Sequence, residues 1–249
     1  CSTWSLAHSP VIVPMDYTPE SNHVAVYGSL VEHALVPDLA LDDGEIHVIS
    51  PSYKTSKVNA QKLNTVNFAE VEVNETGTYS LFALMKSERQ YVFHDGVWKR
   101  FMDYSPAQAE KDRTYLIPSD FKQVPELVPS TSYRSLRTYI SKGTPSLIAQ
   151  FNDQPIHVAF STHPNELKAQ QEVTLNIKNK QQPFSTAQVN ITPYGKPTAQ
   201  GQTFKADEQG NAIVTFPSAG QYMIKIREPF DNSKRPTDEQ IVIISVEVK

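Results

Sequence analysis

The sequence predicts an all-β protein, with two immunoglobulin-like β-sandwich domains in tandem and one short surface helix. Short runs in which apolar and polar residues alternate recur along the whole chain, and Pro, Gly, Asn and Asp separate them. The runs follow one another at about 8–12 residues, which is typical of a sandwich rather than of alternating helices and strands. Helix signals are few.

In the N-terminal half, each predicted strand is one such run. The runs are His23–Gly28, Glu45–Ser50, Val66–Val73, Thr78–Met85 and Gln90–Phe101. The last run contains a hairpin, because Asp95-Gly96 stands between two apolar pairs and this dipeptide accepts the positive φ angles of a tight turn.

The one helix is expected at Ser105–Arg113. Ser105 can cap the first turn, Pro106 suits the first helical position, and good helix formers follow. The next segment, 121–132, is interrupted by prolines and is expected to be extended.

The C-terminal half repeats the strand pattern of the first half. Its runs are 156–160, 172–177, 187–194, 202–206, 212–216, 221–226 and 240–248. A weak internal repeat links the halves, because Gly77-Thr78-Tyr79 and Gly220-Gln221-Tyr222 each lead into a run. We expect both tyrosines to close the core of an immunoglobulin-like sandwich. The sequence therefore predicts an N-terminal domain over 1–143 and a C-terminal domain over 144–249.

Composition excludes several function classes. The chain has 249 residues and a formal net charge of -4, and its Lys and Arg residues form no basic run. Nucleic acid is therefore not expected as a partner. No apolar run approaches the roughly 20 residues of a membrane-spanning helix. Nucleophile elbows and phosphate-binding glycine loops are also absent, which favours a protein that is not an enzyme.

Histidines are the candidate metal ligands, although no standard zinc spacing is present. His157 and His163 differ by an even number, so on one continuous strand they would share a side, but Pro164 suggests that the strand ends there. His8 follows Ser5-Leu6-Ala7, which resembles the end of a signal peptide. Cleavage after Ala7 would give His8 an α-amino group that chelates copper or nickel together with its imidazole. The alternative is that His8 begins a strand and binds nothing.

Cys1, the only cysteine, offers a second maturation scheme. A first-position cysteine followed by Ser-Thr is what a bacterial lipoprotein shows after processing, so a lipid on Cys1 is a possible membrane anchor. The two schemes exclude each other, since cleavage after Ala7 would discard Cys1.

Several motifs resemble an uncharacterised exported bacterial family that is associated with nickel and cobalt uptake and often occurs beside TonB-dependent receptors. The motifs are 7–14 (AHSPVIVP), 36–41 (VPDLAL), 95–101 (DGVWKRF), 137–140 (RTYI), 163–167 (HPNEL), 182–183 (QP), 207–210 (DEQG) and 219–222 (AGQY). The resemblance implies a periplasmic or outer-membrane-associated protein with an immunoglobulin-like C-terminal domain.

Three functions follow as expectations. The first is a non-enzymatic cell-envelope protein that binds or delivers a transition metal (Ni, Co, Cu, Fe or Zn) or a metal chelate, with His8, His157 and His163 as candidate ligands. An outer-membrane receptor or transporter would be its partner. The second is a structural or adhesive lipoprotein anchored through Cys1. The third is a copper mono-oxygenase with an amino-terminal His8, which would need a second histidine nearby.

Overall fold

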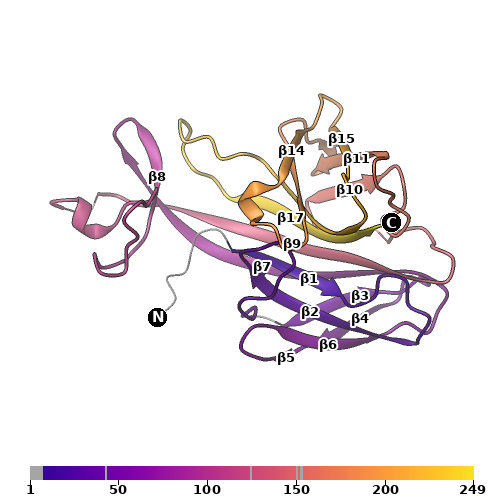
Figure 1. The fold of residues 1–249 in the computed structure, drawn as a ribbon. Coiled ribbons are helices and arrows are strands. Elements are labelled where there is room, and N and C mark those ends of the chain that lie inside the picture. The colour runs from indigo at the N-terminus through magenta and orange to yellow at the C-terminus, as the bar shows by residue number, and fades with distance from the viewer. Residues whose placement is uncertain (1–7, 43, 124, 150, 152–153) are drawn as a thin grey trace.

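A computed structural model describes residues 8–42, 44–123, 125–149, 151 and 154–249 (Figure 1). The described chain is all-β, as predicted. Its strands are β1 (Ser9–Pro14), β2 (His23–Val31), β3 (Glu45–Ile49), β4 (Thr55–Asn59), β5 (Gln61–Lys62), β6 (Asn67–Glu72), β7 (Gly77–His94), β8 (Val97–Phe101), β9 (Val128–Lys142), β10 (Ile156–Phe160), β11 (Glu172–Asn179), β12 (Gln182–Pro183), β13 (Gln188–Pro193), β14 (Gln202–Lys205), β15 (Asn211–Thr215), β16 (Gly220–Arg227) and β17 (Glu239–Val248). Short 3₁₀ turns lie at Pro118–Asp120 and Thr198–Gln200.

Within the described residues the strands form three sheets. The central sheet has the order β14-β13-β16-β17-β9-β7-β3-β4, and β8 pairs with the outer part of β7. The first outer sheet has the order β1-β2-β6-β5, and the second outer sheet joins β10, β11 and β12, with β15 on the other edge of β11. Figure 1 shows the two outer sheets on opposite sides of the long strands β7 and β9.

Two hydrophobic cores lie on opposite faces of the central sheet. In β17, Ile241 and Ile243 belong to the first core, which the first outer sheet covers. Their neighbours Val242 and Ile244 belong to the second core, which the second outer sheet covers. Since successive side chains of a strand point to opposite faces, a strand buried on both faces is apolar throughout. This explains the unbroken apolar run 241–244 in the sequence.

Strands β7 and β9 differ most from the sequence prediction. The predicted runs Thr78–Met85 and Gln90–Phe101 are not separate, because β7 runs through the first and on to His94 in the second. β9 pairs with β7 from Gly77↔Lys142 to Tyr91↔Val128. The predicted hairpin is confirmed. β7 ends at His94, β8 begins at Val97, and Asp95 and Gly96 have φ angles of 54° and 81°.

The internal repeat is confirmed in the two buried tyrosines. Gly77 and Gly220 begin β7 and β16 with φ angles of 126° and 137°, a region that favours glycine. The Tyr79 hydroxyl accepts a hydrogen bond from the Glu75 amide (2.6 Å). The Tyr222 hydroxyl accepts from the Ser218 amide (3.2 Å) and donates to the Ser218 carbonyl (2.7 Å). Each hydroxyl thus returns to the residue four positions earlier.

The predicted helix at Ser105–Arg113 is wrong. The structure has only a turn there, in which the Gln108 and Ala109 amides donate to the Ser105 carbonyl and the Gln108 side chain accepts from the Ser105 hydroxyl. The Glu110 amide then donates to the Tyr115 hydroxyl instead of continuing a helix. A short helix must offset a costly first turn, and this segment is too brief to do so.

The boundary predicted at 143/144 follows the end of β9. Strands β9 and β17, which lie on either side of that boundary in the sequence, pair in parallel from Ser132↔Glu239 to Thr138↔Ser245. The division into domains 1–143 and 144–249 stays a prediction. No helix in the described part of the chain is long and apolar enough to span a membrane.

Candidate metal centre

The pairing of β1 with β2 places His8 beside Glu32. These strands are antiparallel, with Ser9 opposite Val31. His8, the residue before Ser9, therefore lies next to Glu32, the residue after Val31. Glu32 is further fixed through its backbone, because its carbonyl accepts a hydrogen bond from the Thr198 amide (2.9 Å).

Asp38 reaches the same place through the loop that follows β2. This loop turns back, so that Leu39 and Leu30 exchange backbone hydrogen bonds of 3.2 Å and 2.7 Å. The buried hydroxyl of Ser29 accepts a hydrogen bond from the Asp38 amide (3.2 Å) and donates to the Leu39 carbonyl (2.9 Å). Because Ser29 is fully buried, it holds the backbone of Asp38 in one position.

The C-terminal half supports this loop from outside. The Ala34 amide donates to the Lys196 carbonyl (2.8 Å), and the Gly195 amide donates to the Ala34 carbonyl (2.9 Å). The loop between residues 32 and 38 is thus held on one side by its own strands and on the other by a segment more than a hundred residues later in the chain.

His8, Glu32 and Asp38 together form what we call the metal cluster. The ligand atoms of these three side chains all lie within 4.8 Å of one another. His8 Nε2 is 2.6 Å from Asp38 Oδ2, and the His8 side chain is only 12% exposed whereas that of Asp38 is 49% exposed. One imidazole and two carboxylates are thus gathered at a site that is walled on one side and open to solvent on the other.

The residues of the metal cluster fit a divalent transition-metal ion. Two ligands at about 2.1 Å from a tetrahedral ion are themselves about 3.4 Å apart. The contact of His8 with Asp38 is shorter than that and is a hydrogen bond, whereas the ligand atom of Glu32 lies within 4.8 Å of the other two. An ion would therefore replace the proton between His8 and Asp38, and these two side chains would need to move apart by about 0.8 Å.

His163 lies elsewhere and has a local role. Its Nδ1 accepts a hydrogen bond from the Asn165 amide (3.1 Å), and its Nε2 lies 3.1 Å from both the Ser146 carbonyl and the Thr78 hydroxyl. Burial lowers the pKa of His163, although the bond to Ser146 opposes this shift. The neutral ring with its proton on Nε2 satisfies these contacts and joins the segment after β9 to β7.

His157 lies in β10, and its Nε2 is 3.4 Å from the Gln181 side-chain nitrogen. Burial lowers the pKa of His157, and the charge of Arg137 adds to that shift. Of the described residues, only the metal cluster gathers three side chains able to hold a metal, and neither His157 nor His163 is part of it. Their role as ligands stays a prediction. Cys1 and Ser5-Leu6-Ala7 lie outside the described residues.

Sequence reasoning found His8 but missed its two acidic neighbours. Asp38 stands in the family-like motif 36–41, but nothing in that motif indicates a partner. Glu32 could have been found only from the register of β1 on β2, which the sequence does not state.

Comparisons with known proteins give a family and distant likenesses to solved structures. A family model described as "Domain of unknown function (DUF4198)" matches residues 5–228. No curated protein matches. Among solved structures, the FN1–FN3 domains of chicken CNTN1 are 10% identical, with 96% of this chain and 98% of that chain covered and a TM-score of 0.28. A two-domain fibronectin type III segment of chicken tenascin is 11% identical, with the same coverages and a TM-score of 0.24. The BSP domain of a biofilm-associated protein is 14% identical, with 96% and 29% covered and a TM-score of 0.21. Likenesses this distant say nothing of function.

Proposed function

This chain belongs to the DUF4198 family, and from that premise we propose that it is an exported cell-envelope protein that binds or delivers a transition metal or a metal chelate and catalyses no reaction. The convergence of His8, Glu32 and Asp38 in the metal cluster carries the proposal. The resemblance of motifs such as 7–14 and 163–167 to a family associated with nickel and cobalt uptake supports it. So does Ser5-Leu6-Ala7, which has the form of a signal-peptide cleavage site.

The chemistry of the donors narrows the ligand to a divalent ion. Imidazole binds Zn, Cu, Fe and Ni well, and carboxylates suit harder ions, so the mixture accepts divalent Ni, Co, Cu, Fe or Zn. The metal cluster has no sulfur donor of the kind that selects copper(I). Protons compete with the metal for all three side chains, so binding should weaken as the pH falls.

The openness of the metal cluster supports delivery rather than permanent storage. Glu32 and Asp38 are exposed, and three protein donors leave at least one coordination position for water, a chelator or a ligand from another protein. An outer-membrane receptor or transporter could take the ion through that position. Cleavage after Ala7 would add the α-amino nitrogen of His8 as a fourth donor.

The experiment is equilibrium dialysis with Ni, Co, Cu, Fe and Zn, using protein whose amino terminus has been mapped. We expect close to one equivalent of at least one metal. Asp38→Asn and Glu32→Gln should each weaken its binding by about tenfold or more, since each removes a charged donor. Asp42→Asn is the matched control, because it removes the same charge from a side chain that is 99% exposed and lies outside the metal cluster.

Two results would overturn the proposal. One is a stoichiometry far below one for every metal, and the other is equal affinity in Asp38→Asn, Glu32→Gln and the Asp42→Asn control.

Intact mass of natively expressed protein separates the maturation schemes, because a lipid on Cys1 and a chain that starts at His8 exclude each other. A copper mono-oxygenase would need a second imidazole, and the metal cluster supplies only that of His8.

A further inference from the structure

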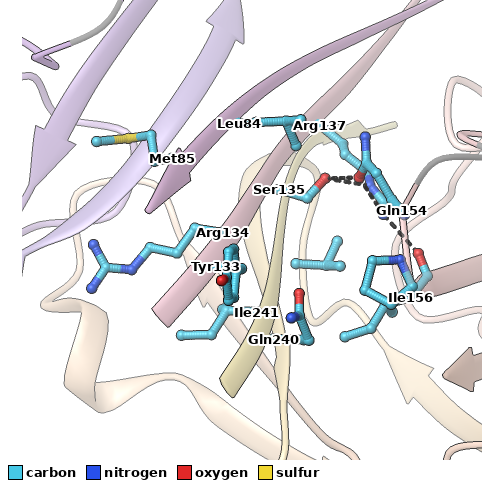
Figure 2. A pocket seen from close by; sticks show the side chains of 12 residues that line it. Leu84, Met85, Tyr133, Arg134, Ser135, Arg137, Gln154, Ile156, Gln240 and Ile241 are labelled. Atoms are coloured by element: carbon cyan, nitrogen blue, oxygen red, sulfur yellow. Dashed lines mark hydrogen bonds between the residues drawn. The ribbon is translucent and has the colours of Figure 1, made fainter. Parts of the chain in front are cut away.

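A cavity of about 200 Å³ lies on the face of the central sheet that carries the second core (Figure 2). Strands β7, β9 and β17 provide one wall, and Gln154, Pro155 and Ile156 provide the other. It shares no residue with the metal cluster. We call it the Arg137 pocket, after a buried charged side chain that lines it.

Arg137 is a buried cation that has no carboxylate partner among the residues that the structure describes. Its side chain is 2% exposed, and no salt bridge in the described part of the chain involves it. Its Nε donates to the Ser135 hydroxyl (2.8 Å), and its Nη2 donates to Gln154 Oε1 (2.8 Å) and to the Ile156 carbonyl (2.7 Å). Burial lowers the pKa of Arg137 to about 10, so the guanidinium is still charged at neutral pH. A buried charge without an opposite charge beside it is energetically costly, and a bound anion would reduce that cost.

The hydrogen bonds of Arg137 leave part of its guanidinium unused. The bonds above engage Nε and Nη2, and none to a described residue engages Nη1. Phe151 lies against the guanidinium, with its ring centre 4.8 Å from Cζ. The guanidinium is therefore fixed in position, with both hydrogens of Nη2 engaged and Nη1 left to donate to a carboxylate.

Gln154 adds a second unused donor at the same place. Its Oε1 accepts from both Ser135 and Arg137, which fixes the direction of the amide. The amide nitrogen Nε2 is then buried with no hydrogen-bond partner among the described residues, and Gln154 is only 6% exposed. Buried donors are almost always paired, and no described residue pairs this one, so it is available to an acceptor on a bound molecule. Figure 2 shows Gln154 and Arg137 together at one side of the pocket, with Arg134 directed away from them.

The rest of the pocket is largely apolar and opens to solvent. Ile156 and Val242 are buried in its wall, whereas Leu84 and Tyr133, at 51% and 41% exposed, stand at its rim. Large exposed apolar side chains next to a cavity are typical of a ligand site. A cavity of about 150 Å³ can hold a benzene ring, so this one has room for a molecule of roughly that size.

We propose that the Arg137 pocket binds a small organic acid, with its carboxylate on Arg137 and Gln154 Nε2 and its apolar body against Ile156, Leu84 and Tyr133. Two unused donors at an apolar cavity select this class of ligand. An inorganic anion would leave the apolar wall unused, and a neutral apolar molecule would leave the cation unpaired.

Binding of benzoate and hexanoate, measured by isothermal titration calorimetry, tests the proposal. We expect saturable binding of at least one of them, with a dissociation constant of about 1 mM or below. Benzamide, which has the same shape without the charge, should bind about tenfold more weakly or worse, because a charged partner roughly doubles the strength of each hydrogen bond. Inorganic phosphate should also bind more weakly than benzoate.

Variants at the rim keep the test independent of folding. Leu84→Glu places a carboxylate beside the mouth and should weaken benzoate binding by about tenfold. Leu84→Gln has nearly the same shape without the charge and should bind benzoate almost as the natural protein does. Leu63→Glu is the control, because it adds the same charge at a leucine that is 50% exposed on the first outer sheet side. Arg137→Met should abolish binding if its thermal melt shows that it folds.

Three outcomes would overturn the proposal. They are no saturable binding of either acid up to about 10 mM, equal affinity for benzoate and benzamide or for benzoate and phosphate, and equal effects of Leu84→Glu and Leu63→Glu. Metal binding should be unchanged in all Leu84 variants, so a failure here leaves the proposed metal function standing, and the reverse also holds.

Discussion

Tyr79 and Tyr222 have the same structural role at two places in the molecule. Each follows a glycine with positive φ by two residues, and each hydroxyl returns to the backbone four residues earlier. Tyr79 packs in the first core and Tyr222 in the second. Each ring therefore fills a core while its hydroxyl fixes the turn that enters the strand.

Removing these hydroxyls should destabilise the protein unequally. Tyr79→Phe loses one acceptor and should lower the free energy of unfolding by about 1 kcal/mol, whereas Tyr222→Phe loses an acceptor and a donor and should lower it by about 2 kcal/mol. Urea denaturation measures both. Tyr53→Phe, at a ring that is 62% exposed, is the control, and an effect no larger than that control in either variant would contradict the interpretation.

At the level of single residues, the chemistry of a side chain could be predicted, but its neighbours could not. The sequence indicated His8 as a ligand because imidazole binds transition metals. It could not indicate Glu32 or Asp38, because the loop that brings them together is held by residues 195–198 from the other half of the chain. The alternation rule suggested that His157 and His163 share a side, but β10 ends at Phe160 and the rule fails beyond it.

At the level of elements, the alternating patterns predicted strands reliably and strand ends poorly. Lys86 and Glu88 are exposed between the two apolar parts of β7, which hid the fact that one strand runs through both. The strand can continue there because β9 pairs with it over its whole inner length. That pairing joins residues far apart in the sequence, and no local pattern indicates it.

The outer parts of these strands gather cations around one carboxylate. Glu239, at the start of β17, pairs with Arg89 of β7 and accepts a hydrogen bond from Ser132 of β9 (2.8 Å). Burial, followed by the charges of Arg227, Arg134 and Arg89, lowers the pKa of Lys225 on β16 to about 8, while Glu239 opposes the shift. The ammonium group of Lys225 is therefore held in a place that disfavours its charge.

Replacing Lys225 should stabilise the protein in a pH-dependent manner. Below about pH 8 the lysine is charged in both states, so the natural protein bears the full cost of the buried charge. Between pH 8 and about 10.5 the folded state releases its proton first, and the stability of the natural protein rises with pH. Lys225→Met should therefore be more stable by about 1–3 kcal/mol at pH 7, with the difference shrinking towards pH 10.5.

Chemical denaturation across this pH range measures the effect. Lys86→Met is the matched control, since Lys86 is an exposed lysine on β7 of the same sheet. A Lys225→Met variant that is less stable than the natural protein at pH 7, or whose advantage does not change with pH, would contradict the assignment.

At the scale of the whole molecule, the sequence predicted two sandwiches but not that they share a sheet. The two cores are separate sets of residues, as two sandwiches require. However, Ile243 and Ile244 are neighbours in β17 that point into different cores. The parallel pairing of β17 with β9, which joins residues about a hundred positions apart, creates this arrangement, and only the folded chain reveals it.

This shared sheet predicts how the protein unfolds. The central sheet forms one side of both cores. If its strands separate, the apolar side chains of both cores are exposed to water, so both cores should unfold in one cooperative transition. Leu81→Ala in the first core and Leu175→Ala in the second remove fully buried side chains, and each should lower the free energy of unfolding by about 2–5 kcal/mol. Differential scanning calorimetry should show one transition that both substitutions shift. Two transitions, each moved by only one of the substitutions, would show instead that the chain folds as the two independent domains 1–143 and 144–249, with the β9–β17 pairing too weak to couple them.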